Sequence, residues 1–405
     1  MAWASLIVVA FTVGAVLHAR GMLPIDHLPP LHAQARPPAL SLLPALLLAA
    51  LAVTVLPAVV ARSRFGTALL AAYGVALAWT VLLALSGDGL AQPFTSRYEY
   101  QAVLPAVGDD PLGWLASFTE RLPGYPTHVR GHPPLAVLVL WALARVGLPG
   151  PLPAAVLVVV VGCSATVAVA VTVRRLAGEE AARQALPYLA LTPAAVWIAT
   201  TMDAFFAGVG AWGVALLVSG GRARVPLGAA AGVLLGALPY LSYGLVPYLL
   251  IPVVAAAVAR ITRATVIACL AGAAAVTAAF AAGGFRWPAG VLATHAEWAA
   301  DPGATRPYLY FLIANLAVLA LLTGPATAAG LVRTVPGGVR ALVAAAIVAV
   351  LALDVSGVTR GEVERIWVPY AVWIVLAAAA SPGRRWLAAQ ALTGLLLQGL
   401  VASPW

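Results

Sequence analysis

Most of the side chains that could carry out chemistry lie in three polar segments, 87–132, 284–307 and 354–366, of a chain that is otherwise strongly apolar. These segments combine carboxylates, imidazoles, guanidinium groups and aromatic rings. A carboxylate can act as general base toward a sugar hydroxyl, Arg can hold a phosphate or pyrophosphate, and Trp or Tyr can stack on a sugar ring. Together, these residue types suit a site for an anionic, lipid-linked sugar.

Three carboxylates are candidates for a base, and each has a structural alternative. Glu99 lies in Arg-Tyr-Glu-Tyr just beyond an apolar segment, where it could instead pair with Arg97. Asp110 follows another Asp and precedes a proline, which a turn or a helix cap also explains. Asp203 begins an apolar segment, so it is either a helix N-cap or, as a carboxylate at the membrane, a functional group.

The imidazoles and guanidinium groups allow binding roles. His128 and His132 are four residues apart, a spacing that could bind a metal on a helix, but the glycine and prolines around His132 favour an extended segment and hydrogen bonding. Arg360 and Arg365 could hold a phosphate. The alternative is a local salt-bridge cluster of Glu362, Glu364 and Arg365. Trp287 and Trp298 are better explained as interfacial anchors than as sugar platforms.

The elements that must position these groups are membrane helices. Of the 405 residues, 62% are hydrophobic and 9% are charged, whereas a soluble protein has about 25% charged residues. Apolar segments of about 15–22 residues recur without strand-like alternation, which predicts an all-α, polytopic transmembrane protein. The first segment lacks a basic n-region and is expected to be a retained helix rather than a signal peptide. The thirteen predicted spans are 3–18, 40–60, 66–86, 152–173, 182–200, 204–219, 225–241, 243–259, 264–283, 308–323, 341–354, 367–380 and 386–401.

The 23 basic residues are all Arg and lie mostly in short loops; with 14 acidic residues they give a net charge of +9, which does not indicate nucleic-acid binding. Cys163 and Cys269 fall in apolar segments and predict neither a disulfide nor a metal site.

The distribution of Arg also indicates whether the ambiguous apolar stretch 133–147 spans the membrane. If it does not span and the N-terminus is inside, 13 Arg face the cytoplasm and 9 face outside; if it spans, the counts become 6 and 16. The positive-inside rule therefore predicts a juxtamembrane or re-entrant helix at 133–147.

In this orientation the acidic residues and His are also distributed unequally between the two sides of the membrane. Of the 14 acidic residues, only Glu179 and Glu180 fall on the inner side, and all six His fall on the outer side. Acidic groups have little influence on membrane insertion. This excess of carboxylates and imidazoles therefore predicts that the outer face carries the function, with the active site between 87–147, 284–307 and 354–367.

The order of the motifs resembles the GT-C superfamily of membrane glycosyltransferases, which includes the mannosyl-, arabinosyl- and aminoarabinosyltransferases that use polyprenyl-phosphate sugars. A long outer loop with an early acidic residue, Glu99 or Asp88, ends in His-Pro-Pro-Leu at His132–Leu135. The next span ends in Arg-Arg-Leu-Ala-Gly. Thr-Met-Asp-Ala follows at 201–204, and Thr-Arg-Gly-Glu-Val-Glu-Arg-Ile-Trp at 359–367 is similar to a stretch in actinobacterial members. The resemblance covers roughly residues 66–380. It departs from the family pattern in that Glu99 has no acidic neighbour, two extra spans come first, and no large C-terminal soluble domain follows.

The resemblance implies two N-terminal transmembrane helices at 1–65 and a catalytic domain at 66–405, with the outer loop 87–132 and the juxtamembrane helix 133–147. It implies inverting transfer of a sugar from a polyprenyl-phosphate donor to a glycan, lipid or protein acceptor. The expected location is the outer face of the cell (plasma) membrane among its lipids, with the N-terminus in the cytoplasm. No obligate metal or cofactor is expected.

Glu99 is the expected general base, and Asp203 and Asp110 are the next candidates for this role. Substrate-binding candidates are Arg130, Arg306, Arg360 and Arg365 for the phosphate, His128 and His132 for hydroxyls, and Arg97, Tyr98 and Glu362.

The alternative function is transport, by a lipid-linked-sugar flippase or a secondary transporter. Thirteen helices suit a transporter. Transporters usually place binding groups near the membrane midplane, whereas the middle portions of these segments carry almost no ionisable groups.

Overall fold

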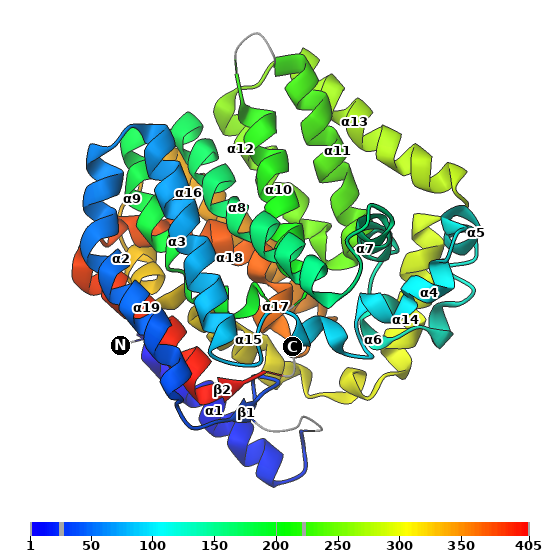
Figure 1. Cartoon of the computed structure of the whole chain (residues 1–405), viewed down its shortest axis with the longest axis horizontal. Coiled ribbons are helices and arrows are strands. Elements are labelled where there is room, and N and C mark those ends of the chain that lie inside the picture. Colours follow the sequence, from blue (N-terminus) through cyan, green and yellow to red (C-terminus); the bar gives the residue numbers. More distant parts are fainter. Residues whose placement is uncertain (1, 24–27, 200, 221–223, 404–405) are drawn as a thin grey trace.

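A computed structural model of the chain describes residues 2–23, 28–199, 201–220 and 224–403. Within these ranges the protein is all-α apart from one pair of two-residue strands, which confirms the predicted fold class (Figure 1). The strands β1 (Gln34–Ala35) and β2 (Val401–Ala402) pair antiparallel. The α-helices are α1 (Ala2–Ala19), α2 (Leu43–Arg62), α3 (Phe65–Leu85), α4 (Leu104–Val107), α5 (Pro111–Ala116), α6 (Thr127–Arg130), α7 (Leu135–Arg145), α8 (Pro151–Ala177), α9 (Glu179–Ala190), α10 (Asp203–Val218), α11 (Arg224–Leu241), α12 (Leu250–Ala259), α13 (Arg263–Ala282), α14 (Trp287–Ala300), α15 (Tyr308–Leu331), α16 (Gly337–Ser356), α17 (Val363–Ile366), α18 (Val368–Ile374) and α19 (Arg384–Leu400).

Eight of the described helices are long and apolar enough to cross a membrane: α1, α2 with its preceding turn, α3, α8, α11, α13, α15 and α16. The chain is therefore a membrane protein. The other five predicted spans contain shorter helices, namely α9, α10, α12, α18 and α19. Proline explains part of this shortening, because it cannot donate to the helical ladder and disfavours a helical residue before it. For example, α9 ends three residues before Pro193, which opens the 3-10 helix η5 (Pro193–Trp197).

Two of the turns predicted to be cytoplasmic, the one between α2 and α3 and the one between α8 and α9, lie against each other at one end of the helix bundle. The guanidinium of Arg174, at the end of α8, lies 4.4 Å from the ring centroid of Phe65 at the start of α3. Arg183 of α9 donates a hydrogen bond to the carbonyl of Val60 in α2. The long polar loop, α14 and α17 lie away from these turns, as Figure 1 shows. Arg222, Asp26 and His27, which the charge count also used, lie outside the described residues.

The ambiguous stretch forms a short helix, α7, directly after Pro133 and Pro134. Its 11 residues extend over only about 16 Å, roughly half the thickness of the hydrocarbon core. In Figure 1, α7 is seen nearly along its own axis, whereas α2, α3 and α8 lie across the view. The indole of Trp141 donates a hydrogen bond to the Gly108 carbonyl at 2.8 Å, which ties α7 to the long loop. These features suit a helix that lies against the bundle instead of spanning the membrane.

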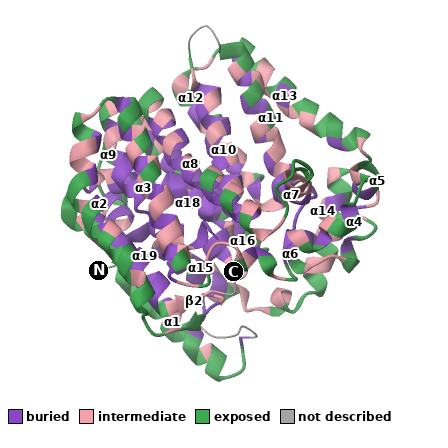
Figure 2. Cartoon of the chain, in the orientation of Figure 1, coloured by how far each residue is buried: buried purple, intermediate pink, exposed green. Residues whose placement is uncertain are grey.

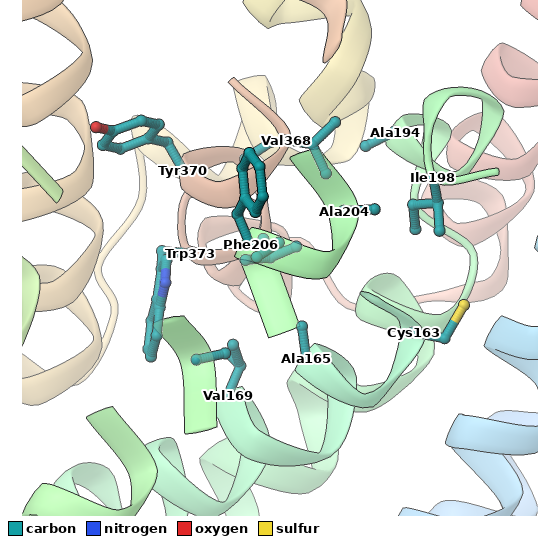
Figure 3. Packing of buried hydrophobic residues seen from close by; sticks show 14 of the residues in the cluster. Cys163, Ala165, Val169, Ala194, Ile198, Ala204, Phe206, Val368, Tyr370 and Trp373 are labelled. Atoms are coloured by element: carbon teal, nitrogen blue, oxygen red, sulfur yellow. The ribbon is translucent and has the colours of Figure 1, made fainter. Parts of the chain in front are cut away.

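The most continuous part of the core surrounds α8, α10 and α18 (Figure 2). Small residues let these helices approach closely: a Cβ on Gly162 of α8 would lie 2.9 Å from the Cβ of Ala204 in α10. Figure 3 shows Phe206 and Trp373 among the side chains that fill the space between them. The indole of Trp373 also donates to the Tyr248 hydroxyl at 2.8 Å. This packing fixes the start of α10 and the end of α17, which carry site residues.

The parallel helices α11 and α13 pack along a row of glycines, and this seam gives a prediction. Gly228, Gly232 and Gly236 face successive turns of α13, and a Cβ on Gly232 would overlap the Cys269 carbonyl. Gly232→Ala is expected to lower the free energy of unfolding by about 1–3 kcal/mol through overpacking. Thermal unfolding in detergent measures the change. The control is Gly74→Ala in α3, where a Cβ meets nothing within 4 Å. An equal loss of stability in both variants would contradict the close packing.

Candidate functional site

Glu99 and His128, both in the long polar loop 87–132, form a buried pair. Glu99 is extended just before the 3-10 helix η3 (Tyr100–Val103), and His128 lies in the single turn of α6. The His128 amide donates to the Tyr98 carbonyl at 3.2 Å, which sets the two segments side by side. The carboxylate Oε1 of Glu99 then lies 2.7 Å from the imidazole Nδ1 of His128, with the two side chains 2% and 6% exposed.

The second oxygen of Glu99, Oε2, is also buried, and it has no hydrogen-bond partner among the described residues. A buried carboxylate oxygen without a partner is costly, since its desolvation is not compensated. The alternative partner, Arg97, instead donates to the Tyr98 hydroxyl at 2.6 Å on the exposed surface. Glu99 is therefore hydrogen-bonded through Oε1, whereas its Oε2 is buried without a partner among the described residues.

Asp203 and Arg365 form a second buried pair, between the start of α10 and α17. Arg365 Nη1 lies 3.2 Å from Asp203 Oδ2, and both side chains are only 4% exposed. Arg365 Nη2 lies 3.0 Å from Glu362 Oε2, and Glu362 in turn lies 3.7 Å from Arg306. The Thr201 hydroxyl donates to Asp203 Oδ2 at 2.5 Å. Three segments that are distant in the sequence therefore meet in one chain of alternating charges.

Tyr100 and His132 connect the two pairs. Tyr100 is 1% exposed, and its ring centroid lies 5.7 Å from that of His132. Burial raises the pKa of Tyr100, and the charges of Asp203 and Glu99 raise this pKa further. Burial lowers the pKa of His132 to about 4, so this imidazole is neutral at pH 7. The His132 ring centroid also lies 6.2 Å from that of Phe206 in α10, the helix that begins at Asp203, so the two pairs lie close together.

The His132 tautomer follows from its partner. Its Nδ1 lies 2.8 Å from the His128 carbonyl oxygen, which can only accept a hydrogen bond. The neutral ring therefore carries its proton on Nδ1. In this arrangement the side chain of His132 holds the backbone of His128 in place.

Glu362 has an unusual backbone conformation for a residue other than glycine. Its φ of 61° and ψ of 12° place it in the left-handed region just before α17, and the preceding Gly361 has a φ of 98°. Such a conformation costs of order 1–3 kcal/mol and persists where surrounding contacts hold it. Here the Arg306 guanidinium donates to the Arg360 carbonyl at 2.8 Å, and the Glu362 carboxylate pairs with Arg365. The turn directs Glu362 and Arg365 toward the site.

Glu364 of α17 contacts His32, a residue that the sequence analysis does not single out. Glu364 is 1% exposed, and its Oε1 accepts a hydrogen bond from the His32 amide at 3.3 Å. The contact joins the N-terminal arm, residues 28–36, to α17. Burial raises the pKa of Glu364 to about 7, and the nearby charge of Glu362 contributes to the rise. No local motif marks His32, because its partner lies 332 residues further along the chain.

The raised pKa of Glu364 predicts a pH-dependent stability. The folded protein binds this proton more tightly than the unfolded chain, so stability falls as pH rises from about 4.5 through about 7. The expected loss is roughly 3 kcal/mol, at about 1.4 kcal/mol per pKa unit. Glu364→Gln should remove this part of the pH dependence, which melting temperatures between pH 4.5 and 8 measure. Identical pH profiles for the wild type and the variant would contradict the prediction.

The structure places the other candidate residues around this centre in structural contacts. Arg360 donates to the carbonyls of Gly357 and Arg306, and its guanidinium lies 5.5 Å from the Trp298 ring centroid and 5.8 Å from the Tyr308 ring centroid. Arg360 therefore holds the polar segments 284–307 and 354–366 together. Arg130 pairs with Glu297 of α14 at 3.2 Å.

Asp110 lies apart from the site. Its carboxylate caps α5 by accepting a hydrogen bond from the Gly113 amide at 2.9 Å, as the alternative interpretation of its sequence context predicts. Arg97 and Tyr98 are paired with each other on the exposed surface nearby.

Among the described residues, no group of three or more His, Cys, Asp or Glu side chains has the arrangement of a metal site. Comparison of the chain with known proteins finds no matching family model, no similar curated protein and no similar solved structure.

Proposed function

We propose that the protein is a membrane glycosyltransferase that moves a sugar from a polyprenyl-phosphate donor to an acceptor hydroxyl with inversion. The observation that carries the proposal is the Glu99 carboxylate, 2% exposed, with one oxygen bonded to His128 and the other without a partner. A buried carboxylate oxygen without a hydrogen-bond partner suits a group that must accept a hydrogen bond and then a proton. The GT-C-like order of the motifs supports the same reaction class.

In this reaction Glu99 Oε2 takes the proton of the acceptor hydroxyl. The acceptor oxygen forms a bond to the anomeric carbon as the bond from that carbon to the phosphate oxygen breaks. The electron pair leaves on the polyprenyl phosphate, and the proton on Glu99 passes to water after the products depart. Arg365 lies 3.2 Å from Asp203 and 3.0 Å from Glu362, so its guanidinium supplies positive charge to the site.

Of the candidates for the donor phosphate, Arg306 is the best placed. Its side chain is 13% exposed and lies 3.7 Å from Glu362, which pairs with Arg365. Its Nε, like that of Arg130, is buried without a hydrogen-bond partner among the described residues. Arg360 is the weakest, because carbonyl oxygens occupy its Nε and Nη1 donors. We assign Arg306 to the phosphate, where a guanidinium stabilises the departing charge.

The orientation belongs to the proposal as well: thirteen crossings, a cytoplasmic N-terminus and a site on the outer face of the cell membrane. A cysteine at Pro149, which is exposed after α7, should react with an impermeant maleimide from outside in a variant lacking Cys163 and Cys269. A cysteine at the exposed Glu180 should react only after the membrane is opened. The reverse pattern would contradict the orientation.

The function itself is tested in membranes with radiolabelled polyprenyl-phosphate sugars and extracts of cell-envelope glycans and lipids as acceptors. Transfer of label that depends on the protein is the expected result. Absence of transfer from every donor, together with saturable uptake of a solute or movement of the lipid-linked sugar across the bilayer, would favour a transporter and overturn the proposal.

A further inference from the structure

We propose that His128 is a positioning residue that selects which oxygen of Glu99 faces the acceptor hydroxyl. The inference rests on the proposed function and deepens it, because it assigns a role to a second side chain of the same site. It starts from the 2.7 Å contact between Glu99 Oε1 and His128 Nδ1, which joins residues 29 positions apart.

The position of the hydrogen between Glu99 and His128 follows from the chemistry of the two side chains. Glu99 must be ionised to act as a base, and an ionised carboxylate only accepts hydrogen bonds. His128 Nδ1 therefore carries a hydrogen and donates it to Oε1. A carboxylate held by one such bond cannot exchange its two oxygens by rotation without losing the bond, so Oε2 remains the oxygen that receives the acceptor proton.

The backbone of His128 is held on both sides, which makes its side chain a fixed support. Its amide donates to the Tyr98 carbonyl at 3.2 Å, and its carbonyl accepts from His132 Nδ1 at 2.8 Å. His132 immediately precedes Pro133 and Pro134, which lead into α7. A continuous hydrogen-bonded path therefore runs from the start of α7 through His132 and His128 to Glu99.

Correct positioning of a general base has a measurable effect on the rate of the catalysed reaction. A base that is displaced by about 1 Å from the reacting atom can lose roughly 100-fold in rate. Loss of the His128 bond frees rotation of the carboxylate without removing its basicity. The change should appear in kcat more than in KM, because the acceptor still binds but meets a wrongly oriented base.

The test compares His128→Ala with His128→Asn, whose side-chain amide nitrogen can take the place of Nδ1 and donate to Glu99. We expect His128→Ala to lower kcat by about 10–100-fold with KM nearly unchanged, and His128→Asn to recover most of that loss. His295→Ala, at an exposed ring that stacks on Trp298, is the control and should leave kcat unchanged. Melting temperatures show that each variant is folded.

A double variant separates positioning from general structural support. If His128 acts through Glu99, then Glu99→Gln with His128→Ala is no slower than Glu99→Gln alone, because residues that act as a unit are not additive. A double variant slower by the product of the single effects would overturn the inference, as would full activity of His128→Ala, or a folded His128→Asn as slow as His128→Ala. Absence of transfer by the wild type would overturn the proposed function instead.

Discussion

Replacement of Glu99 by Gln is expected to lower kcat for sugar transfer by about 10²–10⁴-fold, the usual contribution of a positioned general base. Gln has the same shape, and its carbonyl oxygen can keep the hydrogen bond from His128 Nδ1. The group in the place of Oε2 becomes an amide, which can donate a hydrogen bond but cannot take up a proton. The loss should therefore appear in kcat, with the melting temperature close to that of the wild type.

The matched control for Glu99→Gln is Asp110→Asn. Asp110 has the same type of side chain in the same loop, but it caps α5 on the exposed surface. Asparagine also caps helices well, so this variant should keep both its stability and its rate. Full activity of Glu99→Gln would remove Glu99 as the base. In that event, a large loss of rate in Asp203→Asn would transfer the role to the other buried carboxylate.

Replacement of Arg365 by Met is expected to destabilise the protein by about 3–5 kcal/mol, because it leaves a buried carboxylate without its cation. Asp203 has a 4% exposed side chain and would lose its Arg365 partner, and Glu362 would lose the same partner in its left-handed turn. Thermal or chemical unfolding in detergent measures the effect. The large size follows from burial, since water cannot replace the lost guanidinium.

Two further variants test this explanation for Arg365→Met. Arg145→Met removes the partner of Asp109 in an exposed pair, with side chains 57% and 88% exposed, and should cost only about 0–1 kcal/mol. Adding Asp203→Asn to Arg365→Met removes the uncompensated charge and should restore part of the stability. Equal losses for Arg365→Met and Arg145→Met would show that the buried cluster contributes no more than a surface pair.

The sequence predicts the helical elements well because hydrophobic periodicity and length depend on the local chain. Each of the thirteen predicted spans contains a helix, and Asp110 caps a helix as its position before Pro111 indicates. The lengths are less accurate: prolines such as Pro193 divide several apolar segments into a helix and a 3-10 turn. Hydropathy measures how apolar a segment is, not where its hydrogen-bonded ladder is interrupted.

The partners of the site residues are not predictable from spacing, since they come from distant segments. Glu99 has Arg97 two residues away, yet it pairs with His128 because the backbone bond between Tyr98 and His128 brings those segments together. His32 had no local motif at all, and only tertiary packing places it on Glu364. Predicted site residues such as Asp203 and Arg365 were found by their type, but their contact depends on how α10 packs beside α17.

The small sheet of β1 and β2 has a consequence for biosynthesis. Gln34 and Ala35 pair with Ala402 and Val401, and the Arg36 amide donates to the Leu400 carbonyl at 3.0 Å. A ribosome releases residue 34 long before residue 401, so the N-terminal arm has no strand partner while the intervening helices are being inserted. The arm that carries His32 can reach this paired arrangement only after α19 and the strand that follows it have been synthesised. The contact of His32 with Glu364 is therefore completed by the docking of an early segment onto a late one.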